Sequence, residues 1–182
     1  IFNQSGENEF TLYIYDVIGE SLWFDSVSVS AFRDELAALP EATDTIVVRV
    51  NSEGGDVFDG VTIANLLKDH PAAVNFRIDG LAASIASVIP AIAADEVHMG
   101  AGAFQMIHEP WTLAVGDATE LRKSADLLDQ VSTSTIGPAY AKRLDWSVED
   151  VRDKIKAEDG EWWVDATEAV EIGLADSTFE SS

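Results

Sequence analysis

The sequence predicts an α/β fold, in which strands and helices alternate along the chain. Residues 45–50 (TIVVRV) are β-branched and almost continuously apolar, which is typical of a buried strand in a parallel sheet. Residues 57–67 then place apolar side chains at helical intervals. The same succession returns in residues 74–78 and 84–94. Two strand–turn–helix units in a row indicate right-handed crossovers between parallel strands.

The other elements are predicted on the same grounds. Residues 10–18 are aromatic and β-branched and predict the first strand. A turn follows at residues 51–55, and Gly80 begins a second turn built of small residues. Strands are also expected at 96–99 and 104–107, and helices at 30–39, 117–144, 147–157 and 165–174.

Local signals refine three of these helices. Gly137-Pro138 predicts a kink or break in the helix over 117–144, because proline has no N–H and its ring clashes with the preceding turn. Ser147 is the predicted N-cap of the next helix. Asp165 and Glu168 have the spacing of a capping box at the start of the last one.

Composition limits the classes of function. The 182 residues are expected to form one domain, 1–182, since no repeat, low-complexity tract or linker interrupts them. With 33 acidic against 11 basic residues, the net charge of −22 argues against nucleic acid or anionic membrane as a partner. It is typical of a surface adapted for solubility or high salt. Without cysteine or histidines at ligand spacing, no metal and no cofactor are expected.

Three features fall at the carboxyl ends of predicted strands, where sites gather in open α/β sheets. The pair Gly54-Gly55 follows the first strand of the repeated units, Ser84 follows the second, and His108 follows the strand at 104–107. A glycine pair lets backbone N–H groups approach a developing oxyanion. We therefore expect these residues to meet at one edge of the sheet.

Ser84 stands at a strand-to-helix turn, the setting of an exposed nucleophilic serine. Ala82 and Ala86 flank it two residues away, where such a sharp turn needs small side chains. The helix that begins there supplies free N–H groups and the positive end of its dipole. Serine is also a common helix cap, so Ser84 alone does not separate the two roles. His108 is the only one of three histidines at the predicted active edge.

Four motifs in order resemble the ClpP family of serine peptidases. They are NSEGG (51–55), GLAAS (80–84), MIHEP (106–110) and ATEAVEIGLAD (166–176). The resemblance covers about residues 45–176 and implies a ClpP/crotonase-like fold of repeated β-β-α units with a protruding helical handle, placed after Asp117. The wording GGDVFDG (54–60) is most similar to the phage and prophage branch, whose members are head-maturation or prohead proteases.

The resemblance implies roles for individual residues. Ser84 would attack the scissile carbonyl, and His108 would take its proton and pass it to the leaving amine. The N–H groups of Gly54 and Ile85 would form the oxyanion hole. Substrate would bind as an added strand beside Gly55, Asp56 and Val57.

The acid of the triad is less clear, because the sequence departs from the family at its position. Alignment on the last motif places the acid at Glu161, where the family mostly has Asp. Asp159 is a nearby competitor, and Asp165 is better explained as a helix cap. Glu53 stands where the family has Pro beside the oxyanion loop, and we expect it to point to solvent.

The implied function is a serine endopeptidase that cleaves unfolded or flexible protein segments, in the manner of a phage prohead protease. The implied partner is a second copy of the chain, in rings of seven stacked in pairs, in the cytoplasm of a bacterial or phage-infected cell. An ATPase unfoldase is compatible with the resemblance without being implied by it. Three alternatives stay open: a housekeeping ClpP-like subunit working with an ATPase, a crotonase-fold acyl-CoA enzyme, and an inactive ring-forming scaffold.

Overall fold

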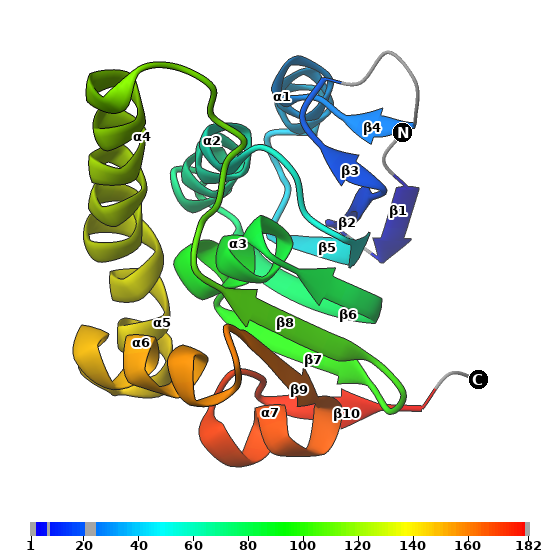
Figure 1. Cartoon of the computed structure of the whole chain (residues 1–182). Coiled ribbons are helices and arrows are strands. Elements are labelled where there is room, and N and C mark those ends of the chain that lie inside the picture. The colour runs from blue at the N-terminus through cyan, green and yellow to red at the C-terminus, as the bar shows by residue number, and fades with distance from the viewer. Residues whose placement is uncertain (1–2, 7, 21–24, 181–182) are drawn as a thin grey trace.

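The computed structural model describes residues 3–6, 8–20 and 25–180 (Figure 1). Its main sheet has the spatial order β1-β2-β5-β6-β7-β10, and β8 pairs with both β6 and β9. The strands of this sheet are β1 (Asn3–Gly6), β2 (Glu9–Tyr15), β5 (Thr45–Ser52), β6 (Ala73–Ala83), β7 (Glu96–Gly100), β8 (Phe104–His108), β9 (Glu161–Asp165) and β10 (Ser177–Phe179). A second, two-stranded sheet pairs β3 (Val17–Ile18) with β4 (Ser26–Val27).

The helices lie between the strands as expected for an α/β fold. They are α1 (Val29–Ala37), α2 (Val57–Lys68), α3 (Ile85–Ala93), α4 (Ala118–Val131), the π-helical turn η1 (Ser132–Ile136), α5 (Gly137–Leu144), α6 (Val148–Ala157) and α7 (Ala166–Ile172). Strands β2, β5, β6 and β7 are mutually parallel, as the repeated strand–turn–helix units require. The predicted α/β class is confirmed.

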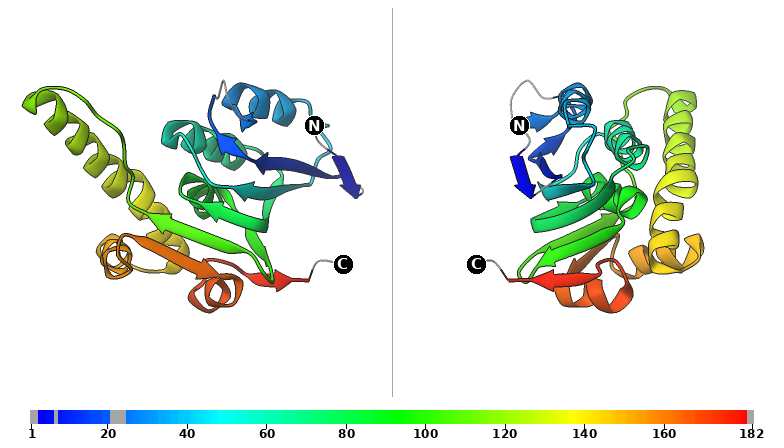
Figure 2. Two further views of the ribbon diagram at one scale, coloured as in Figure 1. Left: turned by 45° about the vertical axis from the view of Figure 1, so that its right-hand side comes forward. Right: turned by 180° about the vertical axis from the view of Figure 1, so that it is seen from behind.

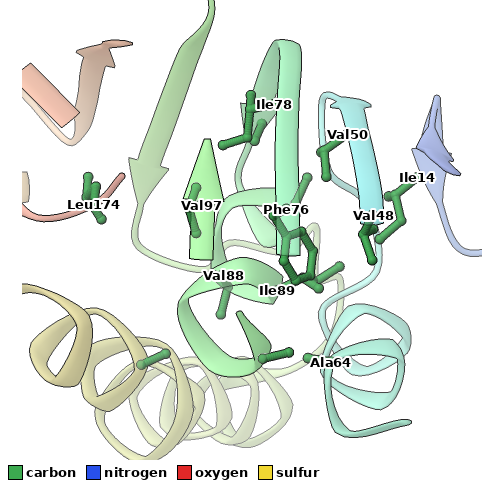
Figure 3. Close-up of a cluster of buried hydrophobic side chains, with 14 of the residues drawn as sticks. Ile14, Val48, Val50, Ala64, Phe76, Ile78, Val88, Ile89, Val97 and Leu174 are labelled. Carbon is green, nitrogen blue, oxygen red and sulfur yellow. The ribbon is translucent and has the colours of Figure 1, made fainter. Parts of the chain in front are cut away.

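The core lies on one face of this parallel sheet. Leu12, Val48, Phe76 and Val97 stand opposite one another on four neighbouring strands, and each is at most 1% exposed. Figure 3 shows side chains of α2 and α3 against this face, with Ile89 of α3 close to the Phe76 ring. The strand at 45–50 is therefore buried on this face only, and its alternate residues, on the other face, are only half-buried.

Two sequence predictions about strands were wrong. Residues 10–18 do not form one strand: β2 stops at Tyr15, Asp16 takes a left-handed φ of 68°, and the chain enters the small sheet. The predicted turn at Gly80 is instead continuous strand, because β6 changes partner. It pairs with β7 as far as Ile78 and with β8 from Leu81 onward.

The helix signals were largely confirmed. Ser147 caps α6 by accepting the N–H of Asp150, and Asp165 caps α7 by accepting the N–H of Glu168. The Glu168 side chain does not complete the predicted capping box, since it accepts the indole N–H of Trp162 instead. The predicted break in the long helix falls at the π-helical turn η1, immediately before Gly137-Pro138. A widened turn is a usual accommodation where proline cannot fit the regular ladder. Strands β9 and β10 were not predicted.

The helix α4 projects away from the sheet, as the two views of Figure 2 show. None of its residues is buried, and Leu121 and Leu127 on its surface are 44% and 48% exposed. This is the protruding handle that the sequence predicted after Asp117. Within the described residues, no helix is both long and apolar enough to cross a membrane.

Phe76 should be one of the strongest contributors to stability. Its ring is fully buried, so Phe76→Ala would leave a cavity and lower the free energy of unfolding by about 3–5 kcal/mol. Phe104→Ala is the matched control, because Phe104 is also in a strand but 42% exposed, and it should cost about 1 kcal/mol or less. Urea denaturation of both variants measures the difference. Equal losses would contradict this placement of the core.

Candidate active site

Ser84 occupies a strained turn between the last residue of β6 and the first of α3. Its φ of 55° and ψ of −130° are rare for a residue with a side chain, and such a conformation costs about 1–3 kcal/mol. The neighbouring chain holds it there: the N–H of Ser84 donates to the carbonyl of Met106 at 2.8 Å. The Ser84 side chain makes no capping hydrogen bond, so the alternative role as a helix cap is excluded in this structure.

The side chain of Ser84 instead meets His108. The two atoms Oγ and Nε2 lie 2.7 Å apart, which is hydrogen-bonding distance. His108 is the last residue of β8, and the parallel pairing of Ala83 with Met106 brings the ends of β6 and β8 together. The sequence predicted this meeting from the places of the two residues at strand ends.

The buried hydroxyl groups of Ser87 and Tyr140 support the turn at Ser84. Ser87 Oγ donates to the carbonyl of Ser84 at 2.7 Å and lies 2.6 Å from the hydroxyl of Tyr140 on α5. Burial raises the pKa of Tyr140 well above its usual value, so its hydroxyl stays protonated and can donate to Ser87. Sequence reasoning missed both residues, because nothing local connects positions 87 and 140.

Close contacts on two sides leave room only for glycine at positions 54 and 55. A Cβ at Gly54, where φ is 101°, would lie 2.7 Å from both the Ala83 carbonyl oxygen and the Ser84 Cβ. A Cβ at Gly55 would lie 2.0 Å from the carbonyl oxygen of Ile18. The loop is fixed there because the N–H of Ile18 donates to Gly54 and the N–H of Asp56 donates to Ile18, each at 2.8 Å.

The N–H groups of this loop differ in what they bind. The N–H of Gly54 donates to Ser52 Oγ at 3.1 Å, so it is already engaged. The peptide between Gly54 and Gly55 directs its carbonyl at Ile18, and in a trans peptide the N–H of Gly55 points the opposite way. That N–H has no partner among the described residues. Ile85 is the first residue of α3, and helix geometry leaves its N–H without an intrahelical partner.

Glu161 lies beside His108 on the neighbouring strand. The two residues are directly paired in the antiparallel ladder of β8 and β9 and therefore share a face. The Glu161 carboxylate accepts the indole N–H of Trp163 at 3.3 Å, and no hydrogen bond or ion pair joins it to His108 in the described part of the chain. Asp159 lies on an exposed turn with a φ of 56° and does not line the cleft that holds Ser84.

Glu109, the residue after His108, turns toward the handle. Its carboxylate accepts the Nε of Arg152 on α6 at 2.8 Å and the hydroxyl of Ser132 in η1. Arg152 also faces Asp129 of α4 at 3.7 Å. Glu109 is thus bound to the base of the handle and does not act as an alternative acid for His108.

Burial sets the protonation state of the histidine. Partial burial of His108 lowers its pKa below the usual value, because a low-dielectric setting disfavours the imidazolium. The negative charges of Glu161 and Glu109 oppose this effect without reversing it. The imidazole is therefore neutral near neutral pH, which is the form that can accept a proton from Ser84.

Ser84 and His108 open into a cleft of about 360 Å³. It is also lined by Val17, Glu53, Gly54, Gly55, Val57, Met106, Pro110, Trp111 and Glu161. A second hollow of about 270 Å³, between the start of α2 and the handle, shares Gly55, Val57, Pro110 and Trp111 with it. The two hollows adjoin at these four residues, and together they are called the groove below.

Two residues of the groove were given roles from the sequence. Glu53 is exposed, as predicted, and lies at the edge of the cleft. The side chain of Asp56, predicted to bind substrate, instead caps α2 by accepting the N–H groups of Phe58 and Asp59. The backbone of Asp56 is engaged too, because its N–H donates to Ile18 and its carbonyl accepts the N–H of Gly60, so the predicted substrate-binding role of Asp56 is not supported.

The comparison with known families identifies the family of the chain. The family model described as Clp protease matches residues 24–182. The chain belongs to the Clp protease family. An ATP-dependent Clp protease proteolytic subunit 2 from Treponema denticola is 31% identical over 134 residues, which cover 73% of this chain and 65% of that protein. A proteolytic subunit 1 from Prochlorococcus marinus is 23% identical, covering 98% of this chain and 94% of that protein.

The fold of this Clp protease family member is also found in a solved structure. A ClpP1 mutant from Listeria monocytogenes matches with a TM-score of 0.77 and 23% identity, covering 94% of this chain and 91% of that one. The predicted ClpP-like fold is therefore confirmed. Within the described residues, no group of three His, Asp or Glu side chains could hold a metal ion.

The charge of Glu161 should act on His108 even without direct contact. We expect NMR titration to give His108 a pKa below that of a free histidine, and a lower one still in Glu161→Gln, because the variant removes a charge that stabilises the imidazolium. Asp159→Asn is the control and should leave this pKa unchanged. An equal shift in both variants would show that Asp159 also faces the imidazole.

Proposed function

We propose that this member of the Clp protease family is a serine endopeptidase acting on unfolded or flexible protein segments. The observation that carries the proposal is the 2.7 Å contact of Ser84 Oγ with His108 Nε2 at a strained turn. Strain of this kind persists only where the surrounding structure enforces it, and it exposes the hydroxyl to the cleft. A scaffold with a decayed site would not need either feature.

The proposed reaction is acyl transfer to Ser84. Neutral His108 accepts the serine proton as Oγ attacks the scissile carbonyl, and it then returns that proton to the leaving amine. Water hydrolyses the acyl-enzyme with the same base. The oxyanion is stabilised by the N–H of Ile85 and by a second N–H from the glycine loop. Gly55 fits this second role better than Gly54, whose N–H is held by Ser52.

Glu161 is the proposed acid that orients His108. Its place opposite His108 in the β8–β9 ladder supports this role, and Asp159 has no comparable place. In the described structure, however, the Glu161 carboxylate binds the Trp163 indole. Completion of the triad therefore requires the flexible Glu161 side chain to leave Trp163 and reach the imidazole Nδ1.

Substrate is proposed to bind as an extended strand along the glycine loop. Ile18 already pairs with one edge of residues 54–56, through the carbonyl of Gly54 and the N–H of Asp56. The opposite edge offers the N–H of Gly55 and that of Val57, which is the first residue of α2 and has no intrahelical partner for this group, and both residues line the cleft. Pairing with backbone groups selects extended chains and not a particular sequence, which suits unfolded or flexible substrates.

Assembly of several copies is proposed for the handle. Trp111, Leu113 and Val115 in the segment before α4 are 74%, 88% and 94% exposed, and Leu121 and Leu127 continue this apolar surface along the helix. Exposed apolar surface of this extent usually marks an interface. We propose a homo-oligomer, with two stacked rings of seven as the arrangement that the family resemblance implies.

The biological setting stays a prediction. The proposed head-maturation role rests on the similarity of the sequence of residues 54–60 to the phage and prophage branch. The comparisons are equally consistent with a housekeeping subunit that works with an ATPase. A crotonase-fold acyl-CoA enzyme is less well supported, because it would need neither the serine nor its contact with His108.

A serine-directed probe tests the nucleophile. We expect a fluorophosphonate to add once, at Ser84, as read by intact mass and peptide mapping, because only an activated serine reacts with such a probe. Ser84→Ala should not be labelled, whereas the control Ser30→Ala, at an exposed serine of α1, should be labelled as wild type. A folded protein without any adduct would contradict the proposed peptidase.

The acid is tested by kinetics on a peptide substrate. Glu161→Gln should lower kcat by between about 10² and 10⁴, because an amide can no longer stabilise the imidazolium that forms in the transition state. Glu161→Asp should retain more activity than Glu161→Gln if a carboxylate is needed. Asp159→Asn should behave as wild type. A large loss in Asp159→Asn alone would transfer the role to Asp159.

A further inference from the structure

The carbonyl of Ser84 is held by two donors from one residue. The N–H of Ser87 donates to it at 3.0 Å, and the hydroxyl of Ser87 donates to it at 2.7 Å. Two donors on one oxygen fix the plane of the peptide that joins Ser84 to Ile85. This peptide is trans, so the N–H of Ile85 points away from the carbonyl that Ser87 holds. Ser87 therefore sets the direction of a proposed oxyanion-hole donor.

That direction leads to the glycine loop. A Cβ added at Gly54 would lie 3.3 Å from the backbone nitrogen of Ile85 and 2.7 Å from Ser84 Cβ, so the loop stands directly beside this amide. A rotation of the Ser84–Ile85 peptide about the line between its two Cα atoms would turn the N–H aside and leave Ser84 Oγ in place. The contact of Ser84 with His108 alone does not prevent such a rotation, whereas the two donors of Ser87 do.

The hydroxyl of Ser87 also reaches the strand that carries His108. Ser87 Oγ lies 3.1 Å from the carbonyl oxygen of Met106, which in turn accepts the N–H of Ser84 at 2.8 Å. Ser87 is fully buried, so its hydroxyl is shielded from bulk water. One hydroxyl thus ties the turn at Ser84 to β8, two residues before the histidine.

Tyr140 determines where the proton of Ser87 goes. Its hydroxyl is buried, lies 2.6 Å from Ser87 Oγ and has no other hydrogen-bond partner among the described residues. A buried hydroxyl that donates to nothing is costly, so Tyr140 donates to Ser87. Ser87 can then donate only to the carbonyls of Ser84 and Met106. The protons form a directed chain from Tyr140 through Ser87 to the Ser84 carbonyl, here called the hydroxyl chain.

The hydroxyl chain is not needed to fill the core. Phenylalanine at position 140 and alanine at position 87 would occupy nearly the same volume without burying two polar groups. Hydrogen bonds in a chain polarise one another, and a carbonyl that accepts strongly makes the N–H of the same peptide a stronger donor. The hydroxyl chain therefore acts on the N–H of Ile85 in two ways, through its direction and through its strength as a donor.

We propose that Ser87 and Tyr140 are positioning residues of the oxyanion hole, which act through the Ser84–Ile85 peptide. The inference rests on the proposed peptidase function, in which the N–H of Ile85 stabilises the oxyanion. It extends the site to α5, the helix that follows η1 at the base of the handle. Loss of the hydroxyl chain should weaken stabilisation of the transition state and leave substrate binding unchanged.

The test compares Tyr140→Phe, Ser87→Ala and the double variant on a peptide substrate. We expect kcat to fall at least about tenfold in Ser87→Ala and about threefold in Tyr140→Phe, with KM unchanged, because the donor is misdirected or weakened but not removed. Tyr13→Phe is the matched control. It removes a hydroxyl from β2, outside the cleft, and should behave as wild type.

A peptide aldehyde reports on the oxyanion hole directly. Ser84 Oγ bonds to the aldehyde carbon, the serine proton passes to His108, and the former carbonyl oxygen takes the negative charge in the oxyanion hole. The affinity for the aldehyde should therefore fall by the same factor as kcat/KM in each variant. An unchanged aldehyde affinity in Ser87→Ala would overturn the inference.

Stability separates this role from general support of the fold. Ser87→Ala leaves the Tyr140 hydroxyl buried without an acceptor and should lower the urea midpoint. The double variant removes both hydroxyls and should recover most of that loss. Its kcat should stay low, because the Ser84 carbonyl still lacks the donor of Ser87.

Two further outcomes would overturn the inference. One is recovery of kcat together with stability in the double variant, and the other is a loss of activity that follows a lower oligomeric mass in light scattering. A folded wild-type protein that neither cleaves the peptide nor reacts with the fluorophosphonate is a different result. It would contradict the proposed peptidase itself, and this role would fall with it.

Discussion

The backbone at Gly54 approaches the turn at Ser84 so closely that a single methyl group would not fit between them. This contact fixes the distance between the loop that offers N–H groups and the hydroxyl that attacks. It needs a left-handed φ at Gly54, and it needs Ile18 to hold the loop from the other side. The geometry of the proposed active site therefore depends on three segments that are not adjacent in the sequence.

The change of partner along β6 explains why the serine and the histidine meet. The first part of β6 pairs with β7, which belongs to the main parallel sheet, and the last part pairs with β8. One strand thus connects the hydrophobic core to the edge that carries the proposed active site. Because β8 also pairs with β9, the same edge receives Glu161. The three groups of the proposed triad therefore come from strands that pair in succession. Ser84 follows the end of β6, His108 ends β8, and Glu161 begins β9.

The sequence could predict what is encoded locally. The α/β class, the handle and the Ser84–His108 pair follow from short motifs and from the order of strands. The fold class is confirmed, and in the structure Ser84 Oγ lies 2.7 Å from His108 Nε2. The sequence placed Gly54 beside Ser84. It could not show that the Gly54 N–H donates to Ser52, because this hydrogen bond depends on the conformation of the loop. Residue types alone do not show which of two adjacent amides points into a cleft.

The missed features all depend on long-range contacts. Ser87 and Tyr140 meet only because α5 packs against α3, and their separation in sequence gives no signal. In β9 the exposed Trp163 stands between the buried Trp162 and Val164, so the sequence shows no alternation of polar and apolar residues that would mark a strand. Its register with β8, which favours Glu161 over Asp159, could be seen only after folding.

The hydrogen bonds of Glu109 connect the base of the handle to the residue that follows His108. Glu109 follows His108 directly, and its carboxylate is bound at once by Ser132 at the base of the handle and by Arg152 of α6. The π-helical turn at that base is the least regular part of the long helix and its natural point of bending. The position of α4 and the backbone beside the imidazole are therefore joined by one short chain of contacts, from Ser132 through Glu109 to His108.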